Sequence, residues 1–398
     1  ADVYQLQRDE SFRPLAGKPG FKLKFPAGAR PDGLKKLTLN NMVQDASKLH
    51  ETVSYELFRA MDVAAPRTGY ATVTVNGEAY GLYLNVETLD DVHLEGWYPA
   101  TRHLYEGGYG YLTDPLDPFD DHYEVDEGDE NDRADLAGLL TTAQDLAPGW
   151  YARVAALADL EQMTRMWATE AYVGHWDGYT GPFVSNYYLH ADDAGRFTML
   201  PWGTDQTLAI RTPLAGGSPL PLLLGGCLQD PICDALYGDA LAAVARVARR
   251  ARLSRRAGTI EREIRAAIAA DPKLEHAAAD ARLGLLATVR FLRERPDDFA
   301  AWAAPRPRAP RVTAAAAGTD AITLRWIKPS ARLRSTLTGI AVEHRRVGGA
   351  WTRVELGPTT TAHTITGLSA GTYEVRVRRL AGAAASIDAA PVSLTVGP

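Results

Sequence analysis

Three polar residues that lie close together in the sequence, Asp177, Asn186 and Asp205, have types and spacing that suit phosphoryl transfer. Asp177 lies in a loop rich in Gly, Pro and Ser, Asn186 begins one apolar run, and Asp205 follows a second. The two runs, at 186–190 and 196–201, predict a β-hairpin. Carboxylate and amide oxygens suit a hard cation such as Mg²⁺, and kinase-type phosphoryl transfer uses such residues in this order. The alternative is that these loop residues only form turns.

A segment near the start of the chain carries two lysines that could reach a nucleotide. Residues 21–25 alternate strictly between apolar and basic, which predicts a β-strand with Lys22 and Lys24 on one face. In protein kinases a strand lysine contacts the nucleotide phosphates. The alternative is an edge strand whose lysines extend into solvent along its surface.

The elements around these residues predict an α+β domain. A short strand at 37–41 precedes a helix for which Asp45 and Ser47 are candidate caps. Glu51 and Glu56 lie in or near the first turns of that helix, where acidic side chains are favoured. A hairpin at 70–87 follows, and its Asn-Gly pair at 76–77 favours a type I′ turn. Strand, helix and hairpin in this order are typical of the α+β class.

Helices are expected on both sides of the segment from Asp177 to Asp205. The spacing of apolar residues predicts one helix over 150–172, ending at Gly174. A second helical region over 236–299 is expected to break near Gly258 and Pro272 and to stop at residues 295–296, Arg-Pro.

Composition excludes several classes of protein. A chain of 398 residues with ordinary apolar and charged fractions is long enough for about two or three soluble domains. Its net charge of −6 argues against general nucleic-acid binding. No apolar run approaches the roughly 18–20 residues that span a membrane.

The chain has two cysteines, Cys227 and Cys233, close enough to close a small disulfide loop. Pro231 between them favours a turn. A disulfide would indicate an oxidising, extracellular or cell-surface location. The alternative is a pair of buried, reduced thiols.

Residues 114–135 are densely acidic. They lack the spacing of an EF-hand loop, so a solvated surface loop is the default interpretation. A weak Ca²⁺ site and a docking surface for a basic partner are the alternatives.

The C-terminal part of the sequence changes character after a proline-rich linker at 304–310. Residues 311–398 predict short strands with inward-facing apolar residues, such as Trp326, and a Tyr373 placed like a tyrosine corner. This segment resembles a fibronectin type III domain, an all-β immunoglobulin-like sandwich. The resemblance implies a ligand on a cell surface or a polysaccharide.

Residues 1–303 resemble the CotH kinase family, named after spore coat protein H. The motifs that carry the resemblance are spread over nearly the whole segment: GKPGFKLKF at 17–25, LTLNN at 37–41, APR at 65–67, VNGE at 75–78, GLY at 81–83, LYEG at 104–107, DGY at 177–179, NYYL at 186–189 and LPW at 200–202. The Cys227–Cys233 loop and the Arg-Pro pair at 295–296 are also similar to features of secreted bacterial members.

The resemblance implies a reduced, atypical kinase-like fold and an ATP- and Mg²⁺-dependent protein kinase that acts on Ser or Thr. Asp177 would orient the acceptor hydroxyl, and Asn186 and Asp205 would hold Mg²⁺. Lys22 or Lys24 would contact the nucleotide phosphates. Glu51 or Glu56 would pair with that lysine, and the sequence decides neither choice.

The sequence departs from the family pattern at one position of the site. Where the family usually has Asp-x-Asp after Pro-Trp, this chain has Gly203, Thr204 and Asp205. The departure favours a second interpretation, a non-catalytic extracellular binding or scaffold protein that attaches through its fibronectin-like module. Transfer of AMP instead of phosphate is a third, which the sequence does not separate from kinase action.

Overall fold

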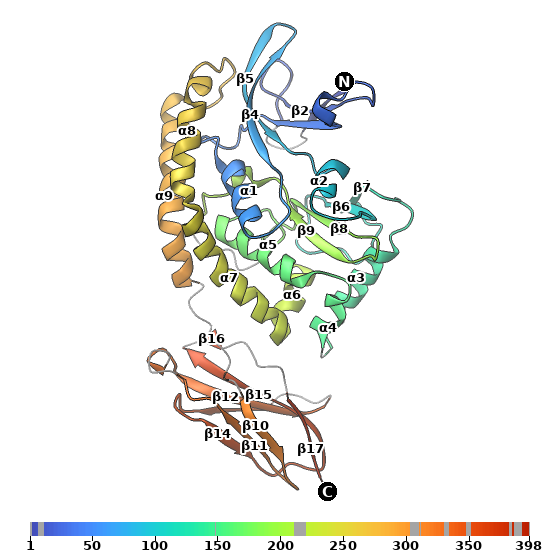
Figure 1. The fold of residues 1–398 in the computed structure, drawn as a ribbon, viewed down its shortest axis with the longest axis vertical. Coiled ribbons are helices and arrows are strands. Elements are labelled where there is room, and N and C mark those ends of the chain that lie inside the picture. The colour runs from blue at the N-terminus through green and yellow to red at the C-terminus, as the bar shows by residue number, and fades with distance from the viewer. Residues whose placement is uncertain are drawn as a thin grey trace. The chain divides into compact units, whose positions relative to one another are not determined.

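The computed structural model of the chain describes residues 2–6, 12–147, 149–210, 220–302, 310, 312–329, 334–347, 352–381, 384–385 and 392–397. The chain divides into two compact units, one of residues 1–226 and 240–302 and the other of residues 227–239 and 303–398. The larger unit combines helices with antiparallel sheets, as expected for an α+β domain (Figure 1). The linker predicted at 304–310 lies almost wholly outside the described residues.

The first sheet of the larger unit has five antiparallel strands in the order β1-β2-β3-β5-β4. Asn76 and Gly77 both have positive φ, 50° and 85°, and form the predicted two-residue turn between β4 and β5. The strands are β1 (Asp2–Leu6), β2 (Gly20–Lys24), β3 (Lys36–Asn40), β4 (Thr68–Val75) and β5 (Glu78–Val86), and a short 3₁₀ helix, η1 (Pro31–Gly33), precedes β3.

The pairing register gives the two faces of this sheet different chemistry. Phe21 pairs with Leu39 on an apolar face, and Lys22 pairs with Thr38 on the other. Helix α1 (His50–Ala60) lies against the lysine face, where Asn40 Nδ2 donates a hydrogen bond of 2.6 Å to Glu51 Oε2. Lys22 and the start of α1 therefore lie on the same side of the sheet.

The second sheet has four antiparallel strands in the order β7-β6-β8-β9. It contains the predicted hairpin, formed by β8 and β9, and 3₁₀ helix η2 follows directly. These elements are β6 (His103–Gly107), β7 (Tyr123–Glu127), β8 (Tyr187–Ala191), β9 (Phe197–Pro201) and η2 (Thr204–Gln206).

The prediction of one continuous helix over 150–172 is wrong. The chain forms two helices there, α4 (Trp150–Ala155) and α5 (Leu160–Val173). Between them, Asp159 caps α5 by accepting a hydrogen bond from Gln162 N, and Asp159 N donates to Phe197 O of β9. Bonding to the sheet thus interrupts the helix. The end at Gly174 is confirmed, and this residue has the left-handed φ of 72° that favours glycine. The other helices before α4 are α2 (Asp91–Glu95) and α3 (Ala134–Gln144).

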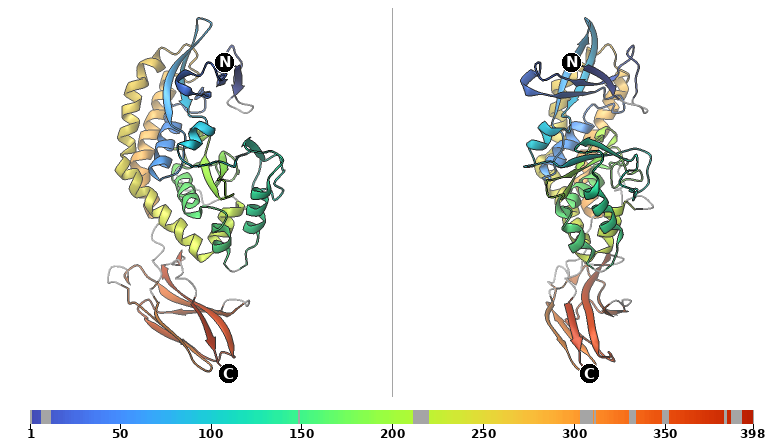
Figure 2. Two further views of the ribbon diagram at one scale, coloured as in Figure 1. Left: turned by 45° about the vertical axis from the view of Figure 1, so that its right-hand side comes forward. Right: turned by 90° about the vertical axis from the view of Figure 1, so that its right-hand side faces the viewer.

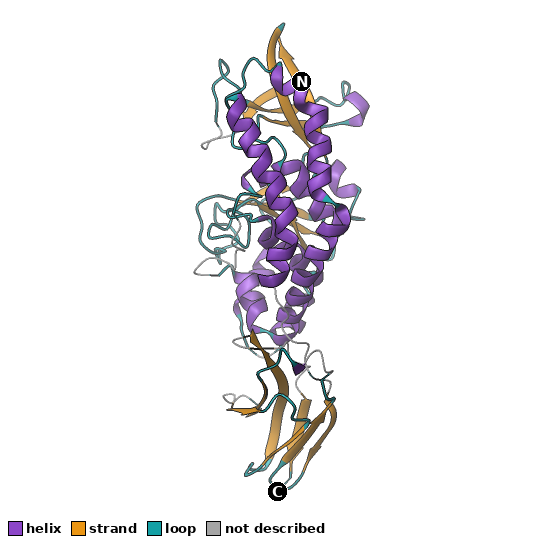
Figure 3. Ribbon diagram, turned by 90° about the vertical axis from the view of Figure 1, so that its left-hand side faces the viewer, coloured by secondary structure: helices purple, strands orange, loops and turns teal. Residues whose placement is uncertain are grey.

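The C-terminal helical region differs from the sequence prediction at two points. It contains α6 (Leu222–Gln229), α7 (Pro231–Ala251), α8 (Leu253–Ala269) and α9 (Ala278–Trp302). Gly258 lies inside α8, and the chain bends instead at Arg252, whose φ is 51°. Pro296 lies inside α9, so the predicted stop at 295–296 is also wrong. Helices α8 and α9 run side by side along the unit (Figures 2 and 3).

Burial of Arg295 explains why α9 continues past its proline. The side chain is 1% exposed, and it donates hydrogen bonds of 2.7 Å to the carbonyls of Ala171 and Tyr172 at the end of α5. Its guanidinium also lies over the rings of Phe291 and Phe299. Helix α9 therefore caps the helix that leads into the Asp177 loop.

The smaller unit contains a β-sandwich with the predicted alternation of apolar residues. Trp326, Val342 and Val377 share one core between the two sheets, and Tyr373 donates a hydrogen bond of 3.1 Å to Ser369 O. One sheet has the order β10-β11-β14 and the other β13-β12-β15-β16, with β17 paired to β15. The strands are β10 (Val312–Ala317), β11 (Ile322–Trp326), β12 (Gly339–Arg346), β13 (Thr352–Leu356), β14 (Ala362–Ile365), β15 (Gly371–Ala381), β16 (Ala384–Ala385) and β17 (Val392–Val396).

Cys227 and Cys233 form a disulfide, as predicted, with their Cα atoms 4.9 Å apart. In the described part of the chain, no helix combines the length and hydropathy that crossing a lipid bilayer requires.

Replacing Arg295 by Met should destabilise the larger unit. The change leaves two buried carbonyls at the end of α5 without their charged donor, at a cost of about 3 kcal/mol. The expected fall in Tm is roughly 6–12 °C. Arg293→Met is the matched control, because Arg293 is on the same helix with its side chain 68% exposed. Thermal unfolding followed by circular dichroism gives both values, and equal Tm values would contradict the role of Arg295.

Candidate functional site

The structure places Asp177, Asn186 and Asp205, the residues predicted to carry out phosphoryl transfer, close to one another. Asn186 Nδ2 donates a hydrogen bond of 3.1 Å to the backbone carbonyl of Asp177. Trp202 N donates to Asn186 O at 2.9 Å, which joins the two ends of the hairpin just before Asp205. The Asp177 carboxylate is close enough for its charge to raise the pKa of Asp205. Asp177 is 6% exposed, and its Oδ1 accepts no hydrogen bond from the described residues.

Gly203 is required by the position of Asn186. It has a left-handed φ of 53°, and a Cβ atom there would lie 2.3 Å from Asn186 Oδ1. A carboxylate at 203 would therefore displace the amide that contacts Asp177. The departure from the family pattern fits the local packing. No local sequence pattern indicates this contact, because the two residues are 17 positions apart.

Four carboxylates crowd the space between α1, the Asp177 loop and η2. Burial, followed by the charges of Asp177 and Asp45, raises the pKa of Asp205 to about 7. Burial and the charge of Asp205 raise the pKa of Glu51 well above its usual value. For Asp45 burial opposes ionisation, but His50, together with hydrogen bonds from His50 N and Ser47, holds its pKa below the usual value. The sequence predicted Asp45 only as a helix cap.

This donor set fits a divalent cation in its chemistry. A bound cation would offset repulsion among the carboxylates, and Asp177 Oδ1 is a buried acceptor that no described residue donates a hydrogen bond to. Among the residues that the structure describes, no three His, Cys, Asp or Glu side chains form a ready metal site. Mg²⁺ commonly takes one or two protein carboxylates and completes its shell with water and phosphate oxygens. Asn186 and Asp205 therefore stay the predicted ligands.

The predicted lysine–glutamate pairs are not present in the described residues. Glu51 is bound to Asn40, as above, and Glu56 pairs with Arg256 of α8 at 2.9 Å. Lys22 is half-buried and its charge acts on Glu106 of β6, whose pKa is raised to about 7, mainly by burial. Lys24 is exposed.

Two buried lysines were missed by sequence reasoning. Lys18 is 2% exposed and pairs with the equally buried Asp271 from the loop between α8 and α9. Lys48 Nζ donates to Met42 O at 2.6 Å, and burial lowers its pKa to about 8. In the sequence, only the GKPG motif around Lys18 indicated that this lysine occupies an unusual position. Its partner is more than 250 residues away, so no local pattern could reveal the pair.

The acidic side chains of segment 114–135 mostly accept hydrogen bonds from residues close to them in the fold. Asp114 is 5% exposed and accepts hydrogen bonds from Tyr179 Oη at 3.1 Å and Leu222 N at 2.6 Å. Burial raises the pKa of Asp114 to about 6. Asp120 accepts from Tyr111 Oη, and Asp135 from Tyr105 Oη. The segment therefore supports the Asp177 loop through Tyr179, and the Ca²⁺ site stays a prediction.

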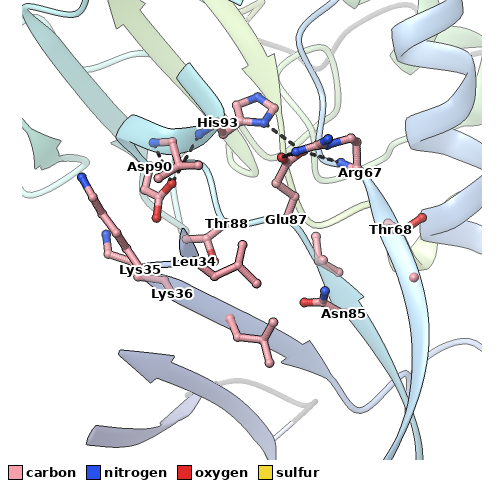
Figure 4. Close-up of a pocket in the computed structure, with 14 residues that line it drawn as sticks. Leu34, Lys35, Lys36, Arg67, Thr68, Asn85, Glu87, Thr88, Asp90 and His93 are labelled. Carbon is pink, nitrogen blue, oxygen red and sulfur yellow. Dashed lines mark hydrogen bonds and ion pairs between the residues drawn. The ribbon is translucent and has the colours of Figure 1, made fainter. Parts of the chain in front are cut away.

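A separate cavity of about 300 Å³ lies beside the first sheet. Arg67 and His93 contact Glu87 on one side of it, and Lys35 and Lys36 lie on another (Figure 4). Burial alone would raise the pKa of Glu87, but the hydrogen bonds from His93 and Arg67 lower it to about 2. None of the predicted site residues lines this cavity.

The larger unit is thus a mixed α/β fold of antiparallel sheets and helices in which a carboxylate-rich site lies beside a β-hairpin. The chain belongs to the CotH family, because residues 10–278 match the family described as "CotH kinase protein".

Among curated proteins, the chain is similar to inner spore coat protein H of Bacillus subtilis (strain 168), with 25% identity over 206 residues. The match covers 48% of this chain and 54% of that relative, so the chain spans about half the length of the curated protein it matches. Among solved structures, the chicken CNTN1 FN1–FN3 domains match 24% of this chain and 33% of theirs at 12% identity and a TM-score of 0.22. The FN5 domain of Drosophila Lar matches 24% of this chain and 99% of its own at 15% identity and a TM-score of 0.20.

Restoring the family carboxylate by Gly203→Asp should weaken the site. The new Cβ would meet the Asn186 side chain, so we expect a loss of about 1–3 kcal/mol in unfolding free energy and no gain in Mg²⁺ binding. Gly195→Asp is the control, because its φ of 74° imposes similar backbone strain while its nearest neighbour is Asp135 Cβ at 3.5 Å. Urea unfolding compares the two variants, and a Gly203→Asp protein as stable as the control would contradict the packing argument.

Asp205 should make the folded chain less stable as the pH rises. Its pKa is about 7 when folded and about 3.9 when unfolded. The folded state therefore binds more protons between these values, and stability falls as the pH rises from about 4 to about 7. Asp205→Asn should be more stable than wild type at about pH 8, by roughly 1–2 kcal/mol, and similar to it at about pH 4.

Thermal unfolding at both pH values, with and without millimolar MgCl₂, measures this dependence. Asp193→Asn is the control, since Asp193 is exposed in the turn between β8 and β9. At the higher pH, Mg²⁺ should stabilise wild type and the control but not Asp205→Asn. If Asp205→Asn were instead more stable than wild type at the lower pH, the predicted direction of the pH dependence of stability would be wrong.

Proposed function

We propose that this chain is a Mg²⁺- and ATP-dependent protein kinase that transfers the γ-phosphoryl group to a Ser or Thr hydroxyl of a polypeptide. The observation that carries the proposal is the meeting of Asp177, Asn186 and Asp205 in one buried, carboxylate-rich space. Membership of the CotH family supports it. Phosphoryl transfer asks a protein mainly to position groups and to neutralise charge, which few residues can do.

Each residue has a role that its surroundings support. The Asp177 carboxylate would accept the proton of the acceptor hydroxyl as its oxygen bonds to the γ-phosphorus and the bond to the β-phosphate oxygen breaks. Asn186 and Asp205 would hold Mg²⁺, which when bound supplies positive charge to the phosphate oxygens. Of the two candidate lysines, half-buried Lys22 is better placed than exposed Lys24 to meet a phosphate.

A non-catalytic binding or scaffold protein is the second candidate. Two observations favour it: Gly203 replaces a family carboxylate, and Glu51 is bound to Asn40 instead of a lysine. AMP transfer would use the same residues as phosphoryl transfer, so only the product distinguishes the two reactions.

We further infer that the C-terminal sandwich is a fibronectin type III domain that binds a cell-surface or polysaccharide ligand. The alternating core and the Tyr373–Ser369 hydrogen bond support this inference. An extracellular or surface location is supported by the disulfide and by the curated relative's being a spore coat protein.

Calorimetric titration of ATP, with and without Mg²⁺, tests the proposal directly. We expect wild type and Asp193→Ala to bind ATP in the presence of Mg²⁺ and Asp205→Ala to lose this dependence. Asp177→Asn should retain binding and lose phosphoryl transfer to a protein acceptor by roughly 100-fold or more. No binding by wild type at millimolar ATP would reject the kinase in favour of the scaffold, and transfer by Asp177→Asn at the wild-type rate would reject the role of Asp177.

A further inference from the structure

The bend between α7 and α8 carries a dense cluster of arginines. Residues 246–256 hold six arginines and no lysine or acidic residue, so this stretch has a charge of +6 in a chain whose net charge is −6. All six arginines are exposed. We call them the arginine patch: Arg246, Arg249, Arg250, Arg252, Arg255 and Arg256.

The spacing of these arginines places them on the outer side of the helices. In α7, Arg246, Arg249 and Arg250 are three and four residues apart, so their side chains lie on one face of the helix. The opposite face of α7 is buried, at Val244 and Ala248. From residue 240 onward, α7 and α8 follow one another along one edge of the larger unit (Figure 2). The arginine patch is therefore accessible to a partner from solvent.

Most of the positive charge in the arginine patch is not balanced by acidic side chains of the described residues. Arg249 pairs with Asp297 of α9, and Arg256 pairs with Glu56 of α1 at 2.9 Å. Like charges three or four residues apart destabilise a helix, so the patch is unfavourable in the isolated chain. The other four arginines form no ion pair with a described residue: Arg246, Arg250, Arg252 and Arg255.

The use of arginine throughout the patch favours a partner that carries phosphate groups. A guanidinium presents its N–H donors as a planar fork that matches the oxygens of a phosphate, whereas a lysine acts as a point charge. Arginines three or four residues apart on a helix have Cβ atoms about 5–6 Å apart, which lets two of them bind one phosphate. Arginine clusters recognise phosphorylated side chains of proteins in this way.

The patch lacks the apolar side chains that a helix inserts into a lipid bilayer. Of the two large apolar residues between positions 246 and 256, Val247 is half-buried and Leu253 is buried. A phosphorylated polypeptide therefore fits the arginine patch better than an anionic membrane does.

We propose that the arginine patch is a docking site for phosphorylated segments of the acceptor polypeptide. The identity of this partner rests on the proposed kinase function, which produces phosphoserine or phosphothreonine on that polypeptide. The patch is on α7 and α8, apart in sequence from the loop and hairpin that carry Asp177, Asn186 and Asp205. A polypeptide held at the patch by one phosphate would present its next hydroxyl to the candidate site more often, because that encounter becomes intramolecular.

Fluorescence anisotropy tests the docking site without requiring kinase activity. The probe is a labelled Gly/Ser peptide that carries several phosphoserines, and its reference peptides carry Ser or Glu at the same positions. We expect wild type to bind the phosphorylated peptide about tenfold or more tightly than the Ser peptide, and more tightly than the Glu peptide. Equal affinity for the phosphorylated peptide and either reference would overturn the proposal.

Matched variants locate the binding to the arginine patch. The first variant replaces by Gln three arginines of the patch without an acidic partner: Arg246→Gln, Arg250→Gln and Arg255→Gln. The control changes the net charge equally at three exposed positions of α9: Arg282→Gln, Arg290→Gln and Arg293→Gln. The patch variant should bind the phosphorylated peptide about tenfold more weakly, and the control should bind it as wild type does. An equal loss in both would show a general charge effect and overturn the proposal.

A third variant keeps the charge and removes only the planar forks, by replacing the same three patch arginines with lysine. It should bind the phosphorylated peptide more weakly than wild type, and unchanged affinity would contradict recognition by arginine forks. Because lysine preserves charge and helix propensity, this variant also replaces the Gln variant if the latter does not fold.

Lipid vesicles test the competing partner. Wild type should not cosediment with phosphatidylglycerol vesicles any more than with phosphatidylcholine vesicles. Binding to phosphatidylglycerol that is lost in the Gln variant of the patch, together with no binding of the phosphorylated peptide, would make the patch a membrane surface and overturn the proposal.

The docking site and the kinase proposal fail in different ways. If wild type transfers no phosphate but binds the phosphorylated peptide through the patch, the kinase proposal fails and the docking of phosphorylated polypeptides stands. If wild type transfers phosphate but does not bind that peptide, the docking site is wrong and the kinase proposal stands. If both hold, the Gln variant of the patch should raise KM for a prephosphorylated acceptor and leave kcat and KM for ATP unchanged.

Discussion

Mutual repulsion among buried carboxylates is the constraint on which this structure depends. Asp45, Glu51, Asp177 and Asp205 come from four different segments; the first three are buried and Asp205 is partly buried. Such a group must be protonated, paired or offset by a cation. The chain uses the first two solutions: Asp45 is held ionised by His50 and by its hydrogen-bond donors, while Glu51 and Asp205 have raised pKa values. Burial also raises the pKa of Asp177, and a bound divalent cation would favour the ionised form of each of these carboxylates.

The frame around these carboxylates is built from contacts between distant parts of the sequence. Arg295 of α9 caps α5, and α5 carries Glu170, which holds the loop of Asp177. From the other side, Asp114 accepts a hydrogen bond from Tyr179 of the same loop. The segment just beyond Asp177 is therefore held from two sides by buried, directional bonds, which limit its movement more than apolar packing alone would. A loop fixed in this way suits chemistry that needs preset geometry.

Local patterns predicted the elements of this fold but not the contacts between them. The hairpin of β8 and β9, the Asn76–Gly77 turn and the end of α5 at Gly174 depend on neighbouring residues, and all three are confirmed. The break at Gly258 and the stop at Pro296 were wrong because tertiary packing outweighs local propensity in long helices. The bonds of Glu170 and the burial of Lys18 join residues without any shared pattern, so only the folded chain reveals them. The roles of the site residues stay predictions.

The glycine at 203 has two opposite physical consequences. It removes a carboxylate that would add to a cation's shell, and this weakens the site as a metal centre. It also avoids a further negative charge beside Asp177 and Asp205, and it leaves room for the Asn186 amide. A protein that only bound a surface ligand would have no use for the remaining buried carboxylates, because replacing such charges by apolar residues is often neutral or stabilising. Natural proteins violate these stability rules mainly at functional sites, so the presence of the cluster is in keeping with the proposed chemistry.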